Sequence, residues 1–276
     1  MNLQHSALWQ EALAQVPGGA SAAAVAVQPL AGGTTNATFR VATDQGTFVV
    51  RLHEPYSVEL GVDRQREAVL QAAAARAGLA SRILVADPQG RFLISEFLVG
   101  EPWRASDLED TTRLTALAQT LFALHALPVP AVPELDLRAL LERHAAQIAA
   151  QDAAAAQDLP PQLARAREIL TRQSDAGRPA CIVHGDLSVT NVIGPDRPRL
   201  IDWEYAGVGD PLADLACLAA YYPQVLRHGA MLLRGCGLSA VAGLPALEEL
   251  AWVYRLLSDL WCRRLELARR HPPPAH

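Results

Sequence analysis

Residues 183–207 read VHGDLSVTNVIGPDRPRLIDWEYAG. This short stretch contains a histidine, two aspartates and an asparagine, which are His184, Asp186, Asp202 and Asn191. Asp186 and Asp202 are sixteen positions apart, and Asn191 follows the first aspartate by five residues. The short apolar runs CIVHG and RLIDW predict two strands that would place Asp202 opposite the loop carrying the other two. Carboxylate and amide oxygens are ligands that Mg²⁺ accepts beside phosphate and water, so the stretch indicates metal-assisted phosphate chemistry. The alternative is that Asp186 and Asn191 only form turns, as such residues often do.

The sequence before this stretch is β-prone and then becomes helical. Runs such as NATFRVAT and TFVVRLH are separated by turn signals, and residues 62–78 show helical spacing that ends at Gly78. From residue 105 helices dominate, through the alanine-rich 145–157 and up to about residue 174, with an interruption at the Pro160–Pro161 pair. Helices resume from Pro211 and continue to about Arg270. We predict an α+β fold with a β-rich N-lobe (1–98), a hinge (99–104) and a mainly helical C-lobe (105–276).

Composition excludes several classes of function. The 276 residues are 50% apolar and 19% charged with a net charge of −5, as in soluble globular proteins, and no basic run favours nucleic acid or an anionic membrane as partner. The N-terminal sequence lacks signal-peptide features and no apolar stretch is long enough to span a membrane, so we expect a cytoplasmic protein. All 24 basic residues are arginine, which excludes a P-loop lysine and a Schiff-base lysine. The four cysteines are dispersed, which argues against a structural metal site.

The pattern H-x-D-x-x-x-x-N at 184–191, followed by I-D-W at 201–203, resembles two segments of kinase-like small-molecule phosphotransferases. That family includes aminoglycoside phosphotransferases, choline and ethanolamine kinases, and thiamine kinase. The resemblance implies a protein-kinase-like two-lobed fold that uses ATP and Mg²⁺. It implies that Asp186 is the catalytic residue beside the acceptor hydroxyl, and that Asn191 and Asp202 bind magnesium. His184 would be structural, and Asp214 in GDPLADLA would brace the catalytic loop.

The resemblance also assigns roles to the N-lobe. LAGGTTNATFRV (30–41) is similar to a nucleotide-covering hairpin, although a plain turn is the alternative. Arg51 occupies the position of the phosphate-binding lysine of protein kinases. Its guanidinium group has the same positive charge but a planar geometry. Glu67 matches its acidic partner, although it could instead lie on a solvated helix face. SEFLVGEPW (95–103) resembles the segment whose backbone binds adenine. The residues that the resemblance implies for nucleotide binding are Gly32, Gly33, Thr35, Asn36, Arg51, Glu67 and, in this segment, Glu96, Phe97 and Leu98.

The sequence motifs that bear on the identity of the phosphoryl acceptor point to different branches of the family. WEYAG resembles choline and thiamine kinases, whereas HGD and GDPLADLA are common in the antibiotic-modifying branch. Tyr254, Ser258 and Trp261 share one helical face, and choline kinases place cation-binding tryptophans in a comparable helix. Here Arg264 stands where a second tryptophan would be expected. The candidate substrate residues are Trp203, Glu204, Tyr254 and Trp261, with core packing as the alternative for the aromatic ones.

We therefore predict an ATP- and Mg²⁺-dependent kinase that phosphorylates a small, singly cationic alcohol resembling choline, ethanolamine or thiamine. The absence of a dense acidic run disfavours a multiply charged aminoglycoside, but an antibiotic phosphotransferase stays open as an alternative. A second alternative is a nucleotide-binding regulatory module without activity. A third, a metal-dependent hydrolase using His184, lacks the further histidines that such sites usually contain.

Overall fold

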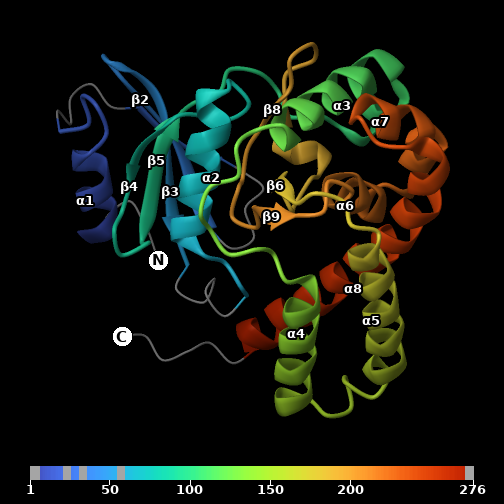
Figure 1. Cartoon of the computed structure of the whole chain (residues 1–276). Coiled ribbons are helices and arrows are strands. Elements are labelled where there is room, and N and C mark those ends of the chain that lie inside the picture. Colours follow the sequence, from blue (N-terminus) through green and yellow to red (C-terminus); the bar gives the residue numbers. More distant parts are fainter. Residues whose placement is uncertain (1–6, 21–25, 31–35, 55–59, 271–276) are drawn as a thin grey trace.

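The computed structural model describes residues 7–20, 26–30, 36–54 and 60–270. Its N-terminal part is one antiparallel sheet with the strand order β1-β2-β3-β5-β4. The strands are β1 (Ala26–Pro29), β2 (Asn36–Thr43), β3 (Gly46–His53), β4 (Ile83–Ala86) and β5 (Phe92–Glu96). Figure 1 shows this sheet on one side of the molecule and most of the helices on the other. The expected β-rich N-terminal region is confirmed.

Helix α1 (Ala7–Ala14) packs on the sheet and completes a small core. The Trp9 ring lies 4.8 Å from that of Phe39 on β2. Alternate residues of the strands, including Val41, Val50 and Ile94, are fully buried in this core, as expected for a sheet with one covered face. The sheet is therefore anchored by its own hydrophobic cluster, separate from that of the helical part.

Helix α2 (Arg64–Arg76) follows the third strand and begins and ends where the sequence predicts. The Asp63 side chain caps it by accepting hydrogen bonds from the backbone N–H groups of Gln65 and Arg66. After the helix, Gly78 adopts a positive φ of 76°, the left-handed conformation that commonly ends a helix. These two caps fix the two ends of α2, whose first turn contains Glu67.

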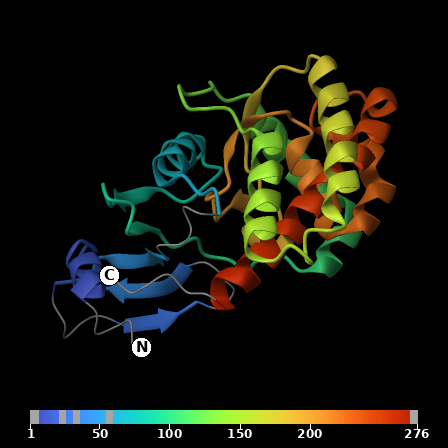
Figure 2. The same cartoon turned by 90° about the horizontal axis from the view of Figure 1, so that it is seen from below.

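The C-terminal part is built from six α-helices among the described residues. They are α3 (Thr111–His125), α4 (Leu137–Gln151), α5 (Leu159–Asp175), α6 (Ala213–Tyr221), α7 (Gly229–Gly235) and α8 (Ala240–Arg270). The leucine repeat of α3 (Leu114, Leu117, Leu121 and Leu124) is fully buried, as its spacing predicts. Figure 2, seen from below, shows the helices as a compact group beside the sheet. Within the described residues, no helix has the combination of length and apolar character needed to cross a membrane.

The prediction of helix between residues 145 and 157 was wrong in its second half. Helix α4 ends at Gln151, and the Asp152 side chain accepts hydrogen bonds from the N–H groups of Ala154 and Ala155. Such local bonds offer the backbone an alternative to the helix. The interruption expected near the Pro160–Pro161 pair is present at residues 152–158, and the two prolines lie just after it in the first turn of α5, where proline is tolerated.

Short strands form the junction between the two parts. β6 (Cys181–Val183) pairs with β9 (Gly207–Gly209), and β7 (Val192–Ile193) pairs with β8 (Arg199–Leu200). The two strands predicted around the central loop are therefore present. The proposed hinge region runs beside β7, where Trp103 donates from its backbone N–H to the Val192 carbonyl and from its indole to that of Gly194. The region between these strands is where the candidate residues meet.

Candidate active site

His184 and Trp203 form the buried base of the central loop. The Nε2 atom of His184 lies 2.8 Å from the carbonyl oxygen of Ile201, and its ring meets that of Trp203 edge-on at 5.0 Å. The Trp203 indole donates to the Leu200 carbonyl at 3.0 Å, and the side chain is fully buried. The structural role of His184 is confirmed. Trp203, expected at the acceptor, is a core residue that does not line the cavity described below, because its indole is already enclosed.

Asp214 braces the loop at its first turn, as the resemblance implied. The fully buried Asp214 accepts a hydrogen bond from the backbone N–H of Gly185 at 3.0 Å and contacts His125 Nε2 at 3.0 Å. Gly185 has a φ of 75°, and a Cβ there would lie 2.3 Å from the carbonyl oxygen of Tyr205. Only glycine permits this close approach, so Gly185 brings the loop of Asp186 against the segment that follows Asp202.

The Asp186 carboxylate is oriented by hydrogen bonds from two sides. Tyr221 at the end of α6 donates its hydroxyl to Oδ1 at 2.8 Å. The Asn191 amide nitrogen donates to Oδ2 at 3.2 Å and to the Asp186 carbonyl at 2.9 Å. Burial, together with the nearby negative charge of Glu204, raises the pKa of Asp186, against the opposing effects of His184 and of these hydrogen bonds. The result is a fixed carboxylate with enhanced proton affinity.

Asp202 has an unusual backbone and a charged partner. Its φ of 63° is the only positive value among the described non-glycine residues, and aspartate tolerates this conformation better than most. Arg51 Nη1 on β3 donates to Asp202 Oδ1 at 2.8 Å. The pKa of Asp202 is raised to about 7 by desolvation and by the negative charges of Glu204 and Asp186, against the attraction of Arg51. A carboxylate held in a strained conformation among other carboxylates is typical of a functional site.

A network of side chains from the sheet and from α2 surrounds Asp202. Glu67, which is 1% exposed, pairs with Arg51 through one oxygen and with Arg64 at 2.9 Å through the other. Arg64 also contacts Glu204 Oε2 at 3.1 Å and Asn36 Oδ1 at 3.0 Å, and Asn36 donates to Glu204 at 2.8 Å. The expected pairing of Arg51 with Glu67 is confirmed. Arg64, which sequence reasoning did not select, links α2 to Glu204.

His53 extends this network as a neutral imidazole. Its Nδ1 lies 2.8 Å from the Gly90 carbonyl and must donate, so Nε2 is left to accept from Arg51 Nε at 3.2 Å. Burial and the charges of Arg51 and Arg64 lower the pKa of His53 to about 3. The Arg51 guanidinium is thus held by the side chains of Glu67, Asp202 and His53, which fixes its direction toward Asp202.

Only some of the residues expected to bind nucleotide lie in the described part of the chain. Gly32, Gly33 and Thr35 lie outside the described residues, whereas Asn36 opens β2 beside Glu204. In the hinge, the N–H groups of Glu96 and Phe97 already donate to the carbonyls of Arg82 and Thr47. These donors are not free for adenine, so the backbone of Leu98 is the better candidate among the three.

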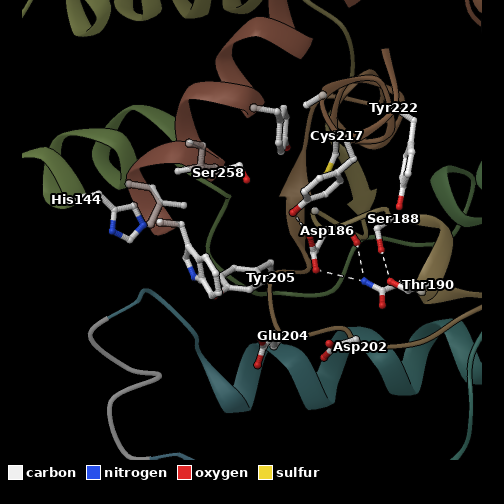
Figure 3. Close-up of a pocket in the computed structure, with 18 residues that line it drawn as sticks. His144, Asp186, Ser188, Thr190, Asp202, Glu204, Tyr205, Cys217, Tyr222 and Ser258 are labelled. Carbon is white, nitrogen blue, oxygen red and sulfur yellow. Dashed lines mark hydrogen bonds between the residues drawn. The ribbon is translucent and has the colours of Figure 1, made fainter. Parts of the chain in front are cut away.

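Asp186, Asn191 and Asp202 open into one cavity of about 360 Å³ (Figure 3). Of the candidate substrate residues, Glu204, Tyr254 and Trp261 line it. The Trp261 indole donates to the Tyr205 hydroxyl at 2.7 Å, which fixes two aromatic walls. Sequence reasoning did not select several further lining residues with polar side chains, among them a histidine and three tyrosines, although the Tyr221–Tyr222 pair shortly after GDPLADLA was an available signal. These four are His144, Tyr205, Tyr221 and Tyr222.

The donor set of this cavity fits a magnesium ion. The Asn191 nitrogen is engaged with Asp186, which leaves its amide oxygen to coordinate, and Asp202 supplies a carboxylate. Three carboxylates line the same space, and a divalent cation would offset their mutual repulsion. Within the described part of the chain, no three histidine, cysteine or acidic side chains gather as a complete metal site. Phosphate and water would have to complete the coordination, which is how Mg²⁺ is usually held beside nucleotides.

Removing Glu67 tests the importance of the buried network for folding. Glu67→Ala leaves Arg51 and Arg64 without their shared carboxylate, and breaking a buried ion pair from one side costs about 3–5 kcal/mol. Because both arginines keep a second acidic partner, we expect the lower end, about 3 kcal/mol, from urea denaturation. Glu142→Ala removes the exposed pair with Arg167 and should cost less than about 1 kcal/mol. Equal losses in the two variants would contradict the prediction.

The sheet with its helix, the helical part and the loop between them define a kinase-like phosphotransferase. The chain belongs to the phosphotransferase enzyme family (APH), whose model matches residues 26–262. The choline/ethanolamine kinase family protein from Mesorhizobium loti has a similar structure, with a TM-score of 0.74 over 97% of this chain and 88% of that one at 22% identity. A similarity at this level of identity shows the fold, and it confirms the predicted kinase-like α+β architecture.

Two relatives are similar in sequence. The acyl-CoA dehydrogenase family member 11 of Rattus norvegicus is 33% identical over 118 residues, which are 41% of this chain and 14% of the relative. The viomycin phosphotransferase of Streptomyces vinaceus is 32% identical over 89 residues, 28% of this chain and 31% of the relative. The chain therefore matches only a minor part of each of these relatives.

Proposed function

We propose that this chain transfers the γ-phosphoryl group of ATP to the hydroxyl of a small, singly cationic alcohol, with Mg²⁺ as cofactor. The observation that carries the proposal is the placement of Asp186, oriented by Tyr221 and Asn191, in one cavity with Asn191 and Asp202. Phosphoryl transfer needs chiefly positioning and charge stabilisation, and these residues offer both.

Each residue has a defined part in this reaction. Asp186 accepts the proton of the acceptor hydroxyl. At the same time the hydroxyl oxygen bonds to the γ-phosphorus of ATP, and the bond between the γ-phosphorus and the bridging oxygen of ADP breaks. Arg51, held by Glu67, binds phosphate oxygens with its guanidinium. Asn191 and Asp202 would hold magnesium, which when bound supplies positive charge to the phosphates. Asp214 and His184 keep the loop in place.

The cavity supports a cationic acceptor of modest size. Its walls include Tyr205, Tyr221 and Trp261, whose ring faces attract cations by about 0.5–2 kcal/mol each. Glu204 and Asp186, which also line the cavity, add negative charge. Arg264 is 1% exposed and does not line the cavity, so it does not take the place of a cage wall. These features favour an amino alcohol or a quaternary ammonium alcohol.

An antibiotic acceptor is the second candidate, because the viomycin phosphotransferase of Streptomyces vinaceus is among the sequence relatives. A cavity of about 360 Å³ lies near the lower end of the range for drug-sized ligands, roughly 300–1,000 Å³. The volume therefore favours the smaller alcohol over an antibiotic.

A coupled ADP-release assay with choline, ethanolamine, thiamine and a set of aminoglycosides tests the proposal. We expect one of the small alcohols to raise ADP release at least about tenfold above the acceptor-free rate, and EDTA to abolish it. Preference for an aminoglycoside would select the antibiotic alternative. Nucleotide binding that is independent of Mg²⁺, with no acceptor-dependent release, would instead indicate a regulatory module without activity.

A further inference from the structure

Helix α4 contributes a histidine to the cavity that the proposed reaction does not use. His144 is 1% exposed, and its Nδ1 atom has no hydrogen-bond partner within the described residues. Tyr254 from α8 lines the same cavity, is 5% exposed, and has a hydroxyl that is likewise buried and unpartnered in the described part of the chain. A buried polar atom without a partner costs about 1–3 kcal/mol, so two of them in one cavity wall point to a missing ligand group.

His144 lies away from the reacting carboxylate. In Figure 3 its imidazole stands at one end of the group of lining side chains, whereas Ser188 and Thr190 of the catalytic loop stand at the other. Asp186 lies between these ends, on the side of the loop. A small acceptor whose hydroxyl reaches Asp186 would therefore present a different part of itself to His144.

The charges around the two ends of the cavity differ in sign. Burial and the positive charges of Arg264 and Arg143 lower the pKa of His144 to about 4, so the imidazole is neutral at pH 7. Asp186, Asp202 and Glu204 also line the cavity and make the part away from His144 acidic. A cationic group would be attracted to the acidic end, and an oxygen that carries partial or full negative charge would be attracted toward His144.

We propose that His144 and Tyr254 bind a carbonyl or carboxylate oxygen of the acceptor by donating hydrogen bonds to it. The acceptor is then a hydroxyl compound that also carries a carbonyl or carboxylate group, which neither choline nor ethanolamine has. This inference rests on the proposed function, because it takes the cavity as the acceptor site. It makes His144 a specificity-determining residue rather than a catalytic one.

The test compares matched pairs of alcohols that differ chiefly in such an oxygen group. The pairs are ethanolamine with serine, 3-aminopropanol with homoserine, and choline with carnitine; serinamide separates a neutral carbonyl from a carboxylate. Binding to the full chain with Mg²⁺ and a non-hydrolysable ATP analogue is measured by calorimetry, and ADP release is measured with ATP. We expect the oxygen-bearing member of at least one pair to bind about tenfold more tightly, because it supplies the missing partners of buried polar atoms.

Variants assign the preference to the two side chains. His144→Phe and Tyr254→Phe should each reduce the preference within the pair to less than about threefold, whereas His144→Gln, which can still donate, should keep part of it. Urea denaturation identifies any variant that fails to fold, and Tyr254→Phe, which removes one oxygen atom, then decides the question.

Equal binding within every pair, including no binding of either member, overturns the inference, as does a preference that persists in the folded variants. These outcomes are separate from failure of the proposed function. If the chain were not a phosphotransferase, acceptor-dependent ADP release would be missing for all alcohols, while a difference in binding within the pairs could still be measured.

Discussion

Asp186→Asn is expected to lower kcat by a factor of about 10²–10⁴, because the amide cannot accept the proton of the acceptor hydroxyl. The KM for ATP should stay within about twofold, since in the proposed reaction Asp186 faces the acceptor and Arg51, still paired with Glu67, would bind the phosphates. ADP release with the best acceptor, measured over a range of ATP and acceptor concentrations, separates these effects.

The same substitution should leave folding intact. Asparagine keeps the size of the side chain and an oxygen for the Tyr221 hydroxyl, and it removes a buried charge whose pKa is raised by burial and by Glu204. The free energy of unfolding should therefore equal or exceed that of the parent. Asp196→Asn, an exposed substitution in the same segment, is the matched control and should retain full activity. A kcat above one third of the parent value for Asp186→Asn would exclude the proposed role.

The sequence predicted those parts of the molecule whose cause is local. Gly78, with its positive φ, ends α2 where the sequence predicts, and the spacing of leucines defines α3, because these signals act within a few residues. The loop motif identified Asp186 and Asn191, and the structure joins them by a hydrogen bond five residues apart. The Arg51–Glu67 pair was available only through the family resemblance, since nothing local links a strand residue to a helix sixteen positions later.

The acceptor wall was harder to predict because helix packing decides it. His144 and Tyr221, which were not selected from the sequence, reach the cavity from α4 and α6, and spacing along one helix cannot show which neighbour it meets. Trp203 is the opposite case. It stands between Asp202 and Glu204 in the sequence, and side chains alternate between the two faces of an extended segment. This alternation would have predicted Trp203 on the face opposite to the two acids. In the structure Trp203 is buried against His184.

Asp202→Asn is expected to reduce activity by about a thousandfold, through the loss of a magnesium-binding carboxylate rather than of a base. Asparagine tolerates the positive φ of 63° and can still accept from Arg51, so the local structure should persist. The substitution also removes a carboxylate whose pKa is raised to about 7 among other acids, so the protein without nucleotide should be at least as stable as the parent.

The stability gained from Mg²⁺ and a non-hydrolysable ATP analogue distinguishes Asp202 from Asp186. At a ligand concentration a hundred times its Kd, the parent should gain about 2.7 kcal/mol, measured by denaturation with and without ligand. Asp186→Asn should keep most of this gain. Asp202→Asn should lose most of the gain that depends on Mg²⁺, so its free energy of unfolding with the ATP analogue should be about the same in Mg²⁺ as in EDTA. If Asp202→Asn gained as much from Mg²⁺ as Asp186→Asn, the metal would have to be held elsewhere. The two aspartates would then need other roles, because the assignment of one to the metal and the other to the hydroxyl proton depends on this difference.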